Sequence, residues 1–294
     1  MIRLVKIFTG ILAVYYLWTQ KNLASVFSGL DISWDMLVLV LVLTSLNWYW
    51  EIKKWQYLVS QVKKIDFLTA TYQSLTGFAV SMLTPNRVGE YGAKVLFFEP
   101  ALRRKIFSLS LIGNFSQLGA TVLFGLAGIF WVWHKKLLDF NLLDGSSGYA
   151  WLWGILFLLL LFIIYKKYLH KPSLLLTDRR IWTGSFRYAI FRYLAFATEF
   201  YLLYQTLNIN VSDIGVLFSA IFIMYFLSAF VPMLAFLDWA VKGSIAVWVF
   251  AQLGLNDVLA LKVTTLMWFF NFFVPFVAGW LIYIFKSHKK HPKL

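Results

Sequence analysis

Long runs of apolar residues, separated by short polar segments, dominate this sequence. A helix needs about 20 predominantly apolar residues to cross the hydrocarbon core of a bilayer, and several runs approach or exceed that length. We therefore predict full membrane spans near residues 4–20, 34–50, 107–133, 149–165, 187–207 and 258–285. The alternating pattern of short strands that is typical of membrane barrels is missing. The predicted fold class is all-α, a polytopic helical membrane protein with these six full spans.

Two further apolar regions, 67–102 and 214–254, are about twice as long as one span and are interrupted in the middle. Each interruption contains a proline, then an acid, then a lysine four residues after the acid. These residues are Pro85, Glu90 and Lys94 in the first region and Pro232, Asp238 and Lys242 in the second. Proline interrupts a helix, and residues four apart share a helical face. Both regions are predicted to be re-entrant helical hairpins; the alternative is four ordinary spans that the prolines merely kink.

The distribution of basic residues predicts the orientation of the chain in the membrane. Most lysines and arginines, Lys53 and Lys54 among them, fall on one side if both termini are cytoplasmic and 67–102 dips in from that side. The hairpin 214–254 then enters from the opposite side. Four kinked spans would instead divide the basic clusters between the two sides, which the positive-inside bias disfavours.

The order of these elements predicts an internal repeat. The predicted order in each half is two spans, one hairpin and one further span. Each half therefore crosses the membrane three times, and this odd number inverts the second half relative to the first. We predict a single membrane domain over 1–294, with inverted halves at about 1–140 and 149–294 joined by a loop at 134–148. Paired broken hairpins in an inverted repeat indicate a substrate site near the membrane midplane.

Composition narrows the chemistry that this domain can perform. The chain is 61% hydrophobic, carries a net charge of +14 and contains no cysteine. Its basic residues lie in loops rather than on one patch, so we do not expect nucleic acid as a partner. Its four histidines fall in loops or in the tail, and no aspartate pairs suit a magnesium diphosphate. We therefore expect neither an enzyme with catalytic residues nor a cofactor or metal site.

Charged residues at membrane depth are the candidate binding residues, since an ionised side chain there costs at least about 2.5–3.5 kcal/mol. A helix that restarts after Pro85 exposes backbone N–H groups that favour an anion such as phosphate, and Arg87 adds a second donor. We predict substrate contacts from Pro85, Asn86, Arg87, Gly89, Glu90, Lys94, Pro232, Asp238 and Lys242. The alternative is that the acid–lysine pairs only stabilise the hairpin tips.

Further polar residues lie within the predicted spans. Arg192 and Glu199 are seven residues apart and therefore share a helical face. Both are candidates for supporting the substrate or coupling to an ion, although Arg192 is expected mainly to extend toward the cytoplasmic surface. Glu199 needs a partner such as Lys242 or Lys262. The amides at membrane depth are expected to join helices, and they are Asn47, Asn114, Gln117 and Asn271.

The stretch from Pro85 to Lys94 resembles the signature of the lysylphosphatidylglycerol synthase transmembrane-region family, the flippase-like integral membrane proteins. Asn47-Trp48, with Glu51 and Lys54-Trp55, resembles a polar segment of its stand-alone bacterial members, and 232–244 is similar to their second hairpin. The resemblance implies a multi-pass protein of the bacterial inner membrane. Both hairpins carry lysine where arginine is more usual, and lysine lacks the guanidinium fork.

Together these features predict a flippase or transporter that moves a lipid, or a lipid-linked substrate, with a polar headgroup between inner-membrane leaflets. The expected partners are membrane lipids, either a phospholipid or a polyprenyl-linked molecule. The alternative function is a non-transporting membrane scaffold, or a lipid-binding partner of a membrane-bound enzyme that synthesises lipids or glycans.

Overall fold

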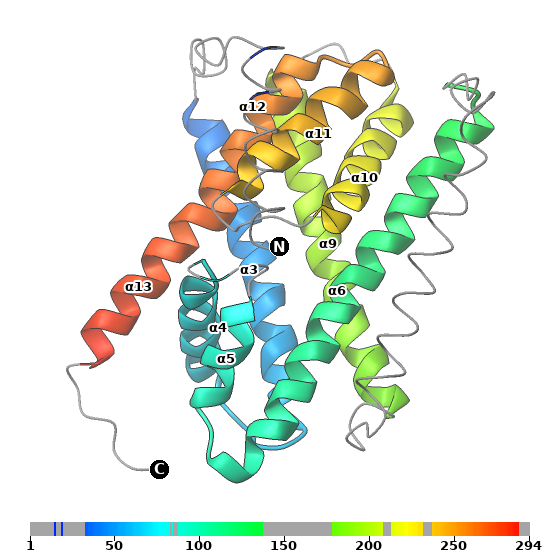
Figure 1. Ribbon diagram of the computed structural model, residues 1–294. Coiled ribbons are helices and arrows are strands. Elements are labelled where there is room, and N and C mark those ends of the chain that lie inside the picture. The colour runs from blue at the N-terminus through cyan, green and yellow to red at the C-terminus, as the bar shows by residue number, and fades with distance from the viewer. Residues whose placement is uncertain are drawn as a thin grey trace.

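A computed structural model describes residues 33–82, 84, 88–137, 178–207, 213–231 and 237–287, together with Tyr15 and Thr19. Within these ranges all regular secondary structure is helical, as the apolar runs predict (Figure 1). The helices are α3 (Trp34–Ser60), α4 (Phe67–Ser81), α5 (Val88–Leu96), α6 (Pro100–His134), α9 (Arg179–Leu207), α10 (Ile214–Phe230), α11 (Asp238–Gln252), α12 (Asp257–Trp268), the π-helical turn η4 (Phe269–Phe273) and α13 (Val274–Ser287). The spans predicted at 4–20 and 149–165 and most of the loop 134–148 lie largely or wholly outside the described residues.

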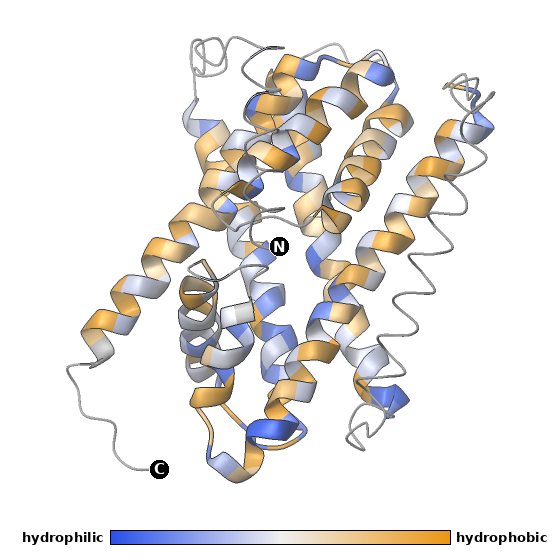
Figure 2. Cartoon of the chain, viewed as in Figure 1, coloured by the Kyte–Doolittle hydropathy of each residue, from blue (hydrophilic) through white to orange (hydrophobic). Residues whose placement is uncertain are grey.

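Among the residues that the structure describes, three helices are long and apolar enough to cross a membrane: Trp34–Ser60, Pro100–His134 and Asp257–Phe285. Their outward faces carry large apolar side chains, for example Leu126 and Phe130 on α6, which a soluble protein would bury. Hydrophobic residues predominate along α6, α10 and α13, whereas hydrophilic residues gather at helix ends and on the lower half of α3 (Figure 2). The fold therefore has the character of a helical membrane protein.

The described helices follow one pattern twice: a long helix, a pair of short helices, then another long helix. The first set is α3, α4–α5 and α6, and the second is α9, α10–α11 and the continuous run α12–η4–α13. In Figure 1 the pair α4–α5 lies in the lower half of the molecule and the pair α10–α11 lies in the upper half. The short helices therefore meet the middle of the molecule from opposite ends.

Local sequence signals explain where the helices begin. An Asn, Asp or Ser side chain before the first turn accepts a backbone N–H that the helix itself leaves unbonded. Four such caps are described, each with the distance from side-chain oxygen to backbone nitrogen. Ser33 accepts from Met36 (3.2 Å), Asp66 from Thr69 (3.2 Å), Asp213 from Gly215 (2.7 Å) and Asn256 from Leu259 (3.0 Å). Helix α6 begins instead with Pro100, which suits a first turn because its missing N–H needs no partner there.

The central helices α3, α6 and α9 hold the molecule together. Helix α3 packs against α9, α6 packs against α10, and α4 packs against α13. One buried cluster includes Phe200, Tyr204 and Phe250, and a second includes Trp55 and Ile106. Asn47, Glu51, Gln117 and Arg192 come from these three helices, so the clusters fix the helices that carry them.

A proline shapes the last long helix next to these polar residues. Pro275 has no backbone N–H, so the carbonyl of Asn271, four residues earlier, receives no bond from it. The indole Nε1 of Trp48 on α3 donates to this carbonyl at 3.3 Å. The adjacent π-helical turn, Phe269–Phe273, contains Asn271 itself. Asn271 thus contacts α3 through its backbone carbonyl as well as its side chain.

Candidate functional site

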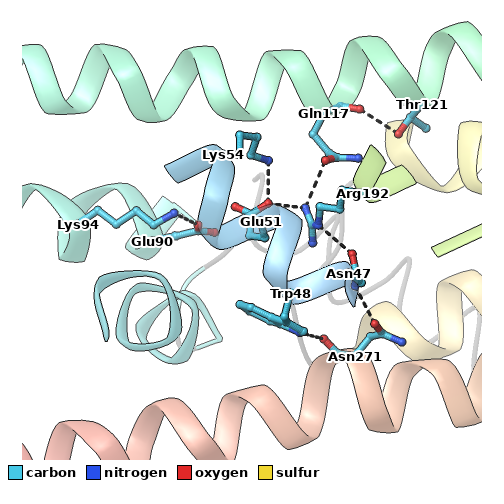
Figure 3. Close-up of polar contacts among 10 residues, drawn as sticks. All are labelled: Asn47, Trp48, Glu51, Lys54, Glu90, Lys94, Gln117, Thr121, Arg192 and Asn271. Atoms are coloured by element: carbon cyan, nitrogen blue, oxygen red, sulfur yellow. Dashed lines mark hydrogen bonds and ion pairs between the residues drawn. The ribbon is translucent and has the colours of Figure 1, made fainter. Parts of the chain in front are cut away.

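One face of α3 carries the polar residues around which the site is built. Asn47, Glu51 and Lys54 are spaced by four and three residues and therefore share a face. The Glu51 carboxylate oxygen Oε2 lies 2.7 Å from Lys54 Nζ and 2.9 Å from Arg192 Nη1 on α9 (Figure 3). The Glu51 side chain is only 12% exposed. A single buried acid is thus shared by two cations.

Arg192 is held inside the helix bundle by three partners. Besides the ion pair with Glu51, its Nε donates to Asn47 Oδ1 at 3.1 Å, and its Nη1 donates to Gln117 Oε1 on α6 at 3.4 Å (Figure 3). The expectation that Arg192 extends toward the cytoplasmic surface is therefore wrong. The reason is the acid on α3, which offers the guanidinium an ion pair in the interior.

Lys54 and its neighbour Lys53 lie in different surroundings. The cytoplasmic side assigned to both stays a prediction, but the Lys54 side chain is only 3% exposed and pairs with Glu51. Successive helical residues point about 100° apart, so neighbours in sequence face different surroundings. Lys53 accordingly lies over the rings of Tyr49 and Phe67, 5.8 and 5.3 Å from their centroids.

A chain of neutral amides connects this centre to Glu199. Asn47 Nδ2 donates to Asn271 Oδ1 at 2.7 Å, and Asn271 Nδ2 donates to Glu199 Oε1 at 2.8 Å. Thr44 on α3 donates to the same oxygen at 3.0 Å. Asn47 and Asn271 therefore join helices, as predicted. Glu199 is fully buried with these neutral donors rather than with Lys242 or Lys262, so the predicted cation partner is wrong, and its role in ion coupling stays a prediction.

The two acid–lysine pairs predicted for the hairpins are both formed. Lys94 Nζ lies 2.6 Å from Glu90 Oε1, and Lys242 Nζ lies 2.8 Å from Asp238 Oδ2. Gly77 on α4 leaves room for the first pair, because a Cβ atom there would lie 3.1 Å from Lys94 Cγ. Gly89 was also predicted to contact substrate; its backbone N–H donates to Thr84 Oγ1 at 2.7 Å. Pro85, Asn86, Arg87 and Pro232 lie outside the described residues.

A cavity of about 670 Å³ lies among α3, α5, α6, α9, α10 and α11. Among the described residues, the charged ones that line it are Arg192, Asp238 and Lys242. Neutral polar side chains complete much of its wall, among them Asn47, Asn114, Gln117 and Thr121. A smaller space of about 80 Å³ shares Asn47 and all three charged residues. The cavity, which is open on part of its surface, thus presents charged groups from α9 and α11 to one shared volume.

The structure divides the predicted site residues into two groups. Asp238, Lys242 and Arg192 line the large cavity, whereas Glu90 and Lys94 line a small neighbouring pocket together with Glu51. Tyr91 on α5 lines both spaces. Glu51 and Lys54 are the residues that the site prediction lacked. Their spacing relative to Asn47 was the available signal, because three polar residues on one face of an apolar helix point toward an interior partner.

Comparison with known proteins adds nothing to this geometry: no model of a known protein family matches the sequence, and no curated protein matches it. The resemblance noted for the two hairpins therefore stays a prediction. The cavity and its charged wall carry the functional proposal.

Proposed function

We propose that the protein moves a lipid, or a lipid-linked molecule, between the two leaflets of the bacterial inner membrane. The observation that carries this proposal is the cavity of about 670 Å³, which holds Arg192, Asp238 and Lys242 among apolar helices. A polar headgroup crossing a bilayer unaided must lose its hydration in hydrocarbon. A cavity with charged and amide groups replaces that hydration, while the lipid tails stay in the surrounding bilayer.

The arrangement of short helices supports a mechanism of alternating access. Short broken helices from two inverted halves commonly frame the substrate site of transporters near the midplane. Here α4–α5 and α10–α11 approach the middle from opposite ends, and α11 contributes Asp238 and Lys242 to the cavity (Figure 1). We interpret the two pairs as re-entrant hairpins, with both termini cytoplasmic, whose halves tilt alternately toward each leaflet.

One observation favours the alternative function, a non-transporting scaffold, for the region around α5. Lys94 Nζ lies 2.6 Å from Glu90 Oε1 and 4.5 Å from the Trp55 ring centroid. This pair lines the small pocket rather than the large cavity. This packing fits a pair that fixes α5 against α3. A non-transporting scaffold or lipid-binding partner of a synthase would use both acid–lysine pairs in this way.

A leaflet-resolved lipid assay separates transport from scaffolding. Purified protein is reconstituted into vesicles that contain fluorescent phospholipids, and an impermeant quencher reports the fraction that reaches the outer leaflet. We expect vesicles with wild-type protein to exchange lipid faster than empty vesicles, and Glu90→Gln/Asp238→Asn to lose most of this activity. Asp35→Asn, at the exposed first turn of α3, is the matched control. Unchanged exchange by the double variant would refute the transport mechanism.

A further inference from the structure

Glu199 on α9 is a carboxyl group in the interior that no cation neutralises directly. The residue is fully buried, and it takes part in none of the ion pairs of the described residues. Its Oε1 accepts from Thr44 Oγ1 at 3.0 Å and from Asn271 Nδ2 at 2.8 Å. Its Oε2 is buried and has no hydrogen-bond partner among the described residues. An ionised carboxylate in such a place is costly, and a proton on Oε2 removes the charge.

Two amides, Asn47 and Asn271, form a relay with a fixed direction between Arg192 and Glu199. A guanidinium has only donors, so Arg192 Nε requires Asn47 to present its oxygen, at 3.1 Å (Figure 3). Asn47 then turns its Nδ2 toward Asn271 Oδ1, at 2.7 Å, and Asn271 turns its own Nδ2 toward Glu199. Every donor of this amide relay therefore points from Arg192 toward Glu199. The orientation of both amides depends on the groups at the two ends.

The charges around the cavities show what a proton on Glu199 would change. Among the described residues, the large cavity, the smaller space and the small pocket are lined by four cations and three acids. An ionised Glu199 balances these charges, whereas a protonated Glu199 leaves one cation in excess. Arg192 carries this excess, because it shares Glu51 with Lys54. The charge of Glu199 thus decides whether the cation at the other end of the amide relay is balanced.

The titratable groups on the helices around Glu199 form no ion pair with it in the described part of the chain. The acids Glu51 and Asp238 lie 2.7 and 2.8 Å from their own lysines, and the Tyr225 hydroxyl donates to Met267 Sδ at 3.7 Å. No cation is left to neutralise Glu199, so a proton is the available alternative. The groups considered are Glu51 and Lys54 on α3, Tyr225 on α10, Asp238 and Lys242 on α11, Lys262 on α12, and Arg192 and Tyr193 on α9 itself.

We propose, taking the transport function above as given, that Glu199 is a proton-binding site and that the amide relay couples its protonation to Arg192 in the cavity. A proton suits this site better than a metal ion. Hydrogen-bond donors occupy Oε1, and a hard metal cation needs about six or more oxygen ligands. Asn271 also lines the space of about 80 Å³, so water there lies one side chain away from the carboxyl. Hydronium in that space gives its proton to Glu199 and recovers it when Glu199 ionises.

Coupling between two sites is reciprocal. A headgroup that contacts Arg192 therefore changes the proton affinity of Glu199, and a proton on Glu199 changes how strongly Arg192 holds the headgroup. The proton is thus the ion to which movement of the headgroup is coupled.

Infrared difference spectroscopy of the purified protein tests the proton site without any lipid substrate. Spectra are recorded between about pH 9 and about pH 5, where exposed carboxyl groups stay largely ionised. We expect a band from a protonated carboxyl group to appear on acidification, to be lost in Glu199→Gln and to persist in Asp35→Asn. A band that Glu199→Gln retains, or no band in the wild type, overturns the proposal. So does a band that appears only after sodium is removed, because the site would then bind a metal ion.

A second variant keeps the test valid if size-exclusion chromatography shows that Glu199→Gln is not folded. Thr44→Val is close in shape and removes one of the two donors to Glu199 Oε1. Because this donor stabilises the ionised carboxylate, the band should be larger in Thr44→Val than in the wild type at the same pH. An equal band in folded Thr44→Val contradicts the assignment to Glu199.

Substitution of Arg192 tests the coupling. Arg192→Gln removes the positive charge at the other end of the amide relay, so Glu199 should bind a proton about tenfold more tightly, a typical coupling between linked sites. The same band should then reach half intensity at a pH about one unit higher. Arg187→Gln, an exposed arginine on the same helix outside the cavity, should leave the titration unchanged. An unchanged titration in folded Arg192→Gln refutes the coupling.

The outcome also separates this inference from the transport function. A carboxyl band that depends on Glu199 and Arg192, in a protein that exchanges no lipid between leaflets, supports the proton site and contradicts transport. Lipid exchange by a protein that shows no such band supports transport and contradicts the proton site.

Discussion

Replacing Glu51 with glutamine is expected to destabilise the protein more than any other single change at the site. Glu51 is the acid that pairs with both Lys54 and Arg192, at 2.7 and 2.9 Å. Without its charge, two cations remain in the interior, and the Lys54 side chain is only 3% exposed. Breaking a buried ion pair by removing one partner costs about 3–5 kcal/mol. We expect a loss of stability in that range.

Thermal unfolding in one detergent, followed by tryptophan fluorescence, measures this effect. The double variant Glu51→Gln/Lys54→Met removes one of the two cations that lose their acid partner, and it should recover part of the lost stability. Asp35→Asn changes an exposed acid on the same helix and should differ little from wild type. If Glu51→Gln unfolds at the wild-type temperature, then the shared acid does not hold α3 against α9.

The second large effect is expected in transport rather than stability. Arg192→Gln should slow leaflet exchange of an anionic phospholipid by about 10- to 100-fold. A hydrogen bond to a charged group contributes about 1.5–3 kcal/mol, and 1.4 kcal/mol corresponds to a factor of ten. Arg192 lines both the large cavity and the smaller space that shares residues with it, so its guanidinium is placed to contact a headgroup in either space.

Matched variants show which property of Arg192 matters. Arg192→Lys keeps the charge but loses the planar fork and should recover only part of the rate. Arg187→Gln on the same helix should exchange lipid at the wild-type rate. Because Glu51 still has Lys54 as a partner in Arg192→Gln, this variant should fold. Exchange at the wild-type rate in folded Arg192→Gln would show that the headgroup does not use this cation.

Much of the helical layout could be predicted because its signals are local. The region predicted as hairpin 67–102 begins at the first residue of α4, and 214–254 begins at the first residue of α10. In both regions an aspartate before the first turn caps the first helix, Asp66 for α4 and Asp213 for α10. The acid–lysine pairs could also be predicted, since residues four apart meet on any helix. The complete set of six spans and the inverted repeat remain predictions.

The centre of the site could not be predicted because it depends on how helices pack. Glu51 meets Arg192 only when α3 and α9 lie side by side in one particular register, and no local pattern specifies that register. The same reason explains the error for Glu199. The sequence suggested a cation partner, whereas the packed helices give Glu199 two neutral donors.

Access to the cavity from both sides of the membrane is the most direct test of the central claim. The chain contains no cysteine, so Thr121→Cys in the cavity wall gives a single reactive thiol without background. Leu123→Cys, at an apolar position on α6 that is 51% exposed and outside the cavity lining, is the control that a charged, membrane-impermeant maleimide is expected not to reach. In sealed vesicles of known orientation, we expect the reagent to label Cys at 121 when it is added to either side. Labelling from one side only, or from neither, would contradict a cavity that opens to both leaflets.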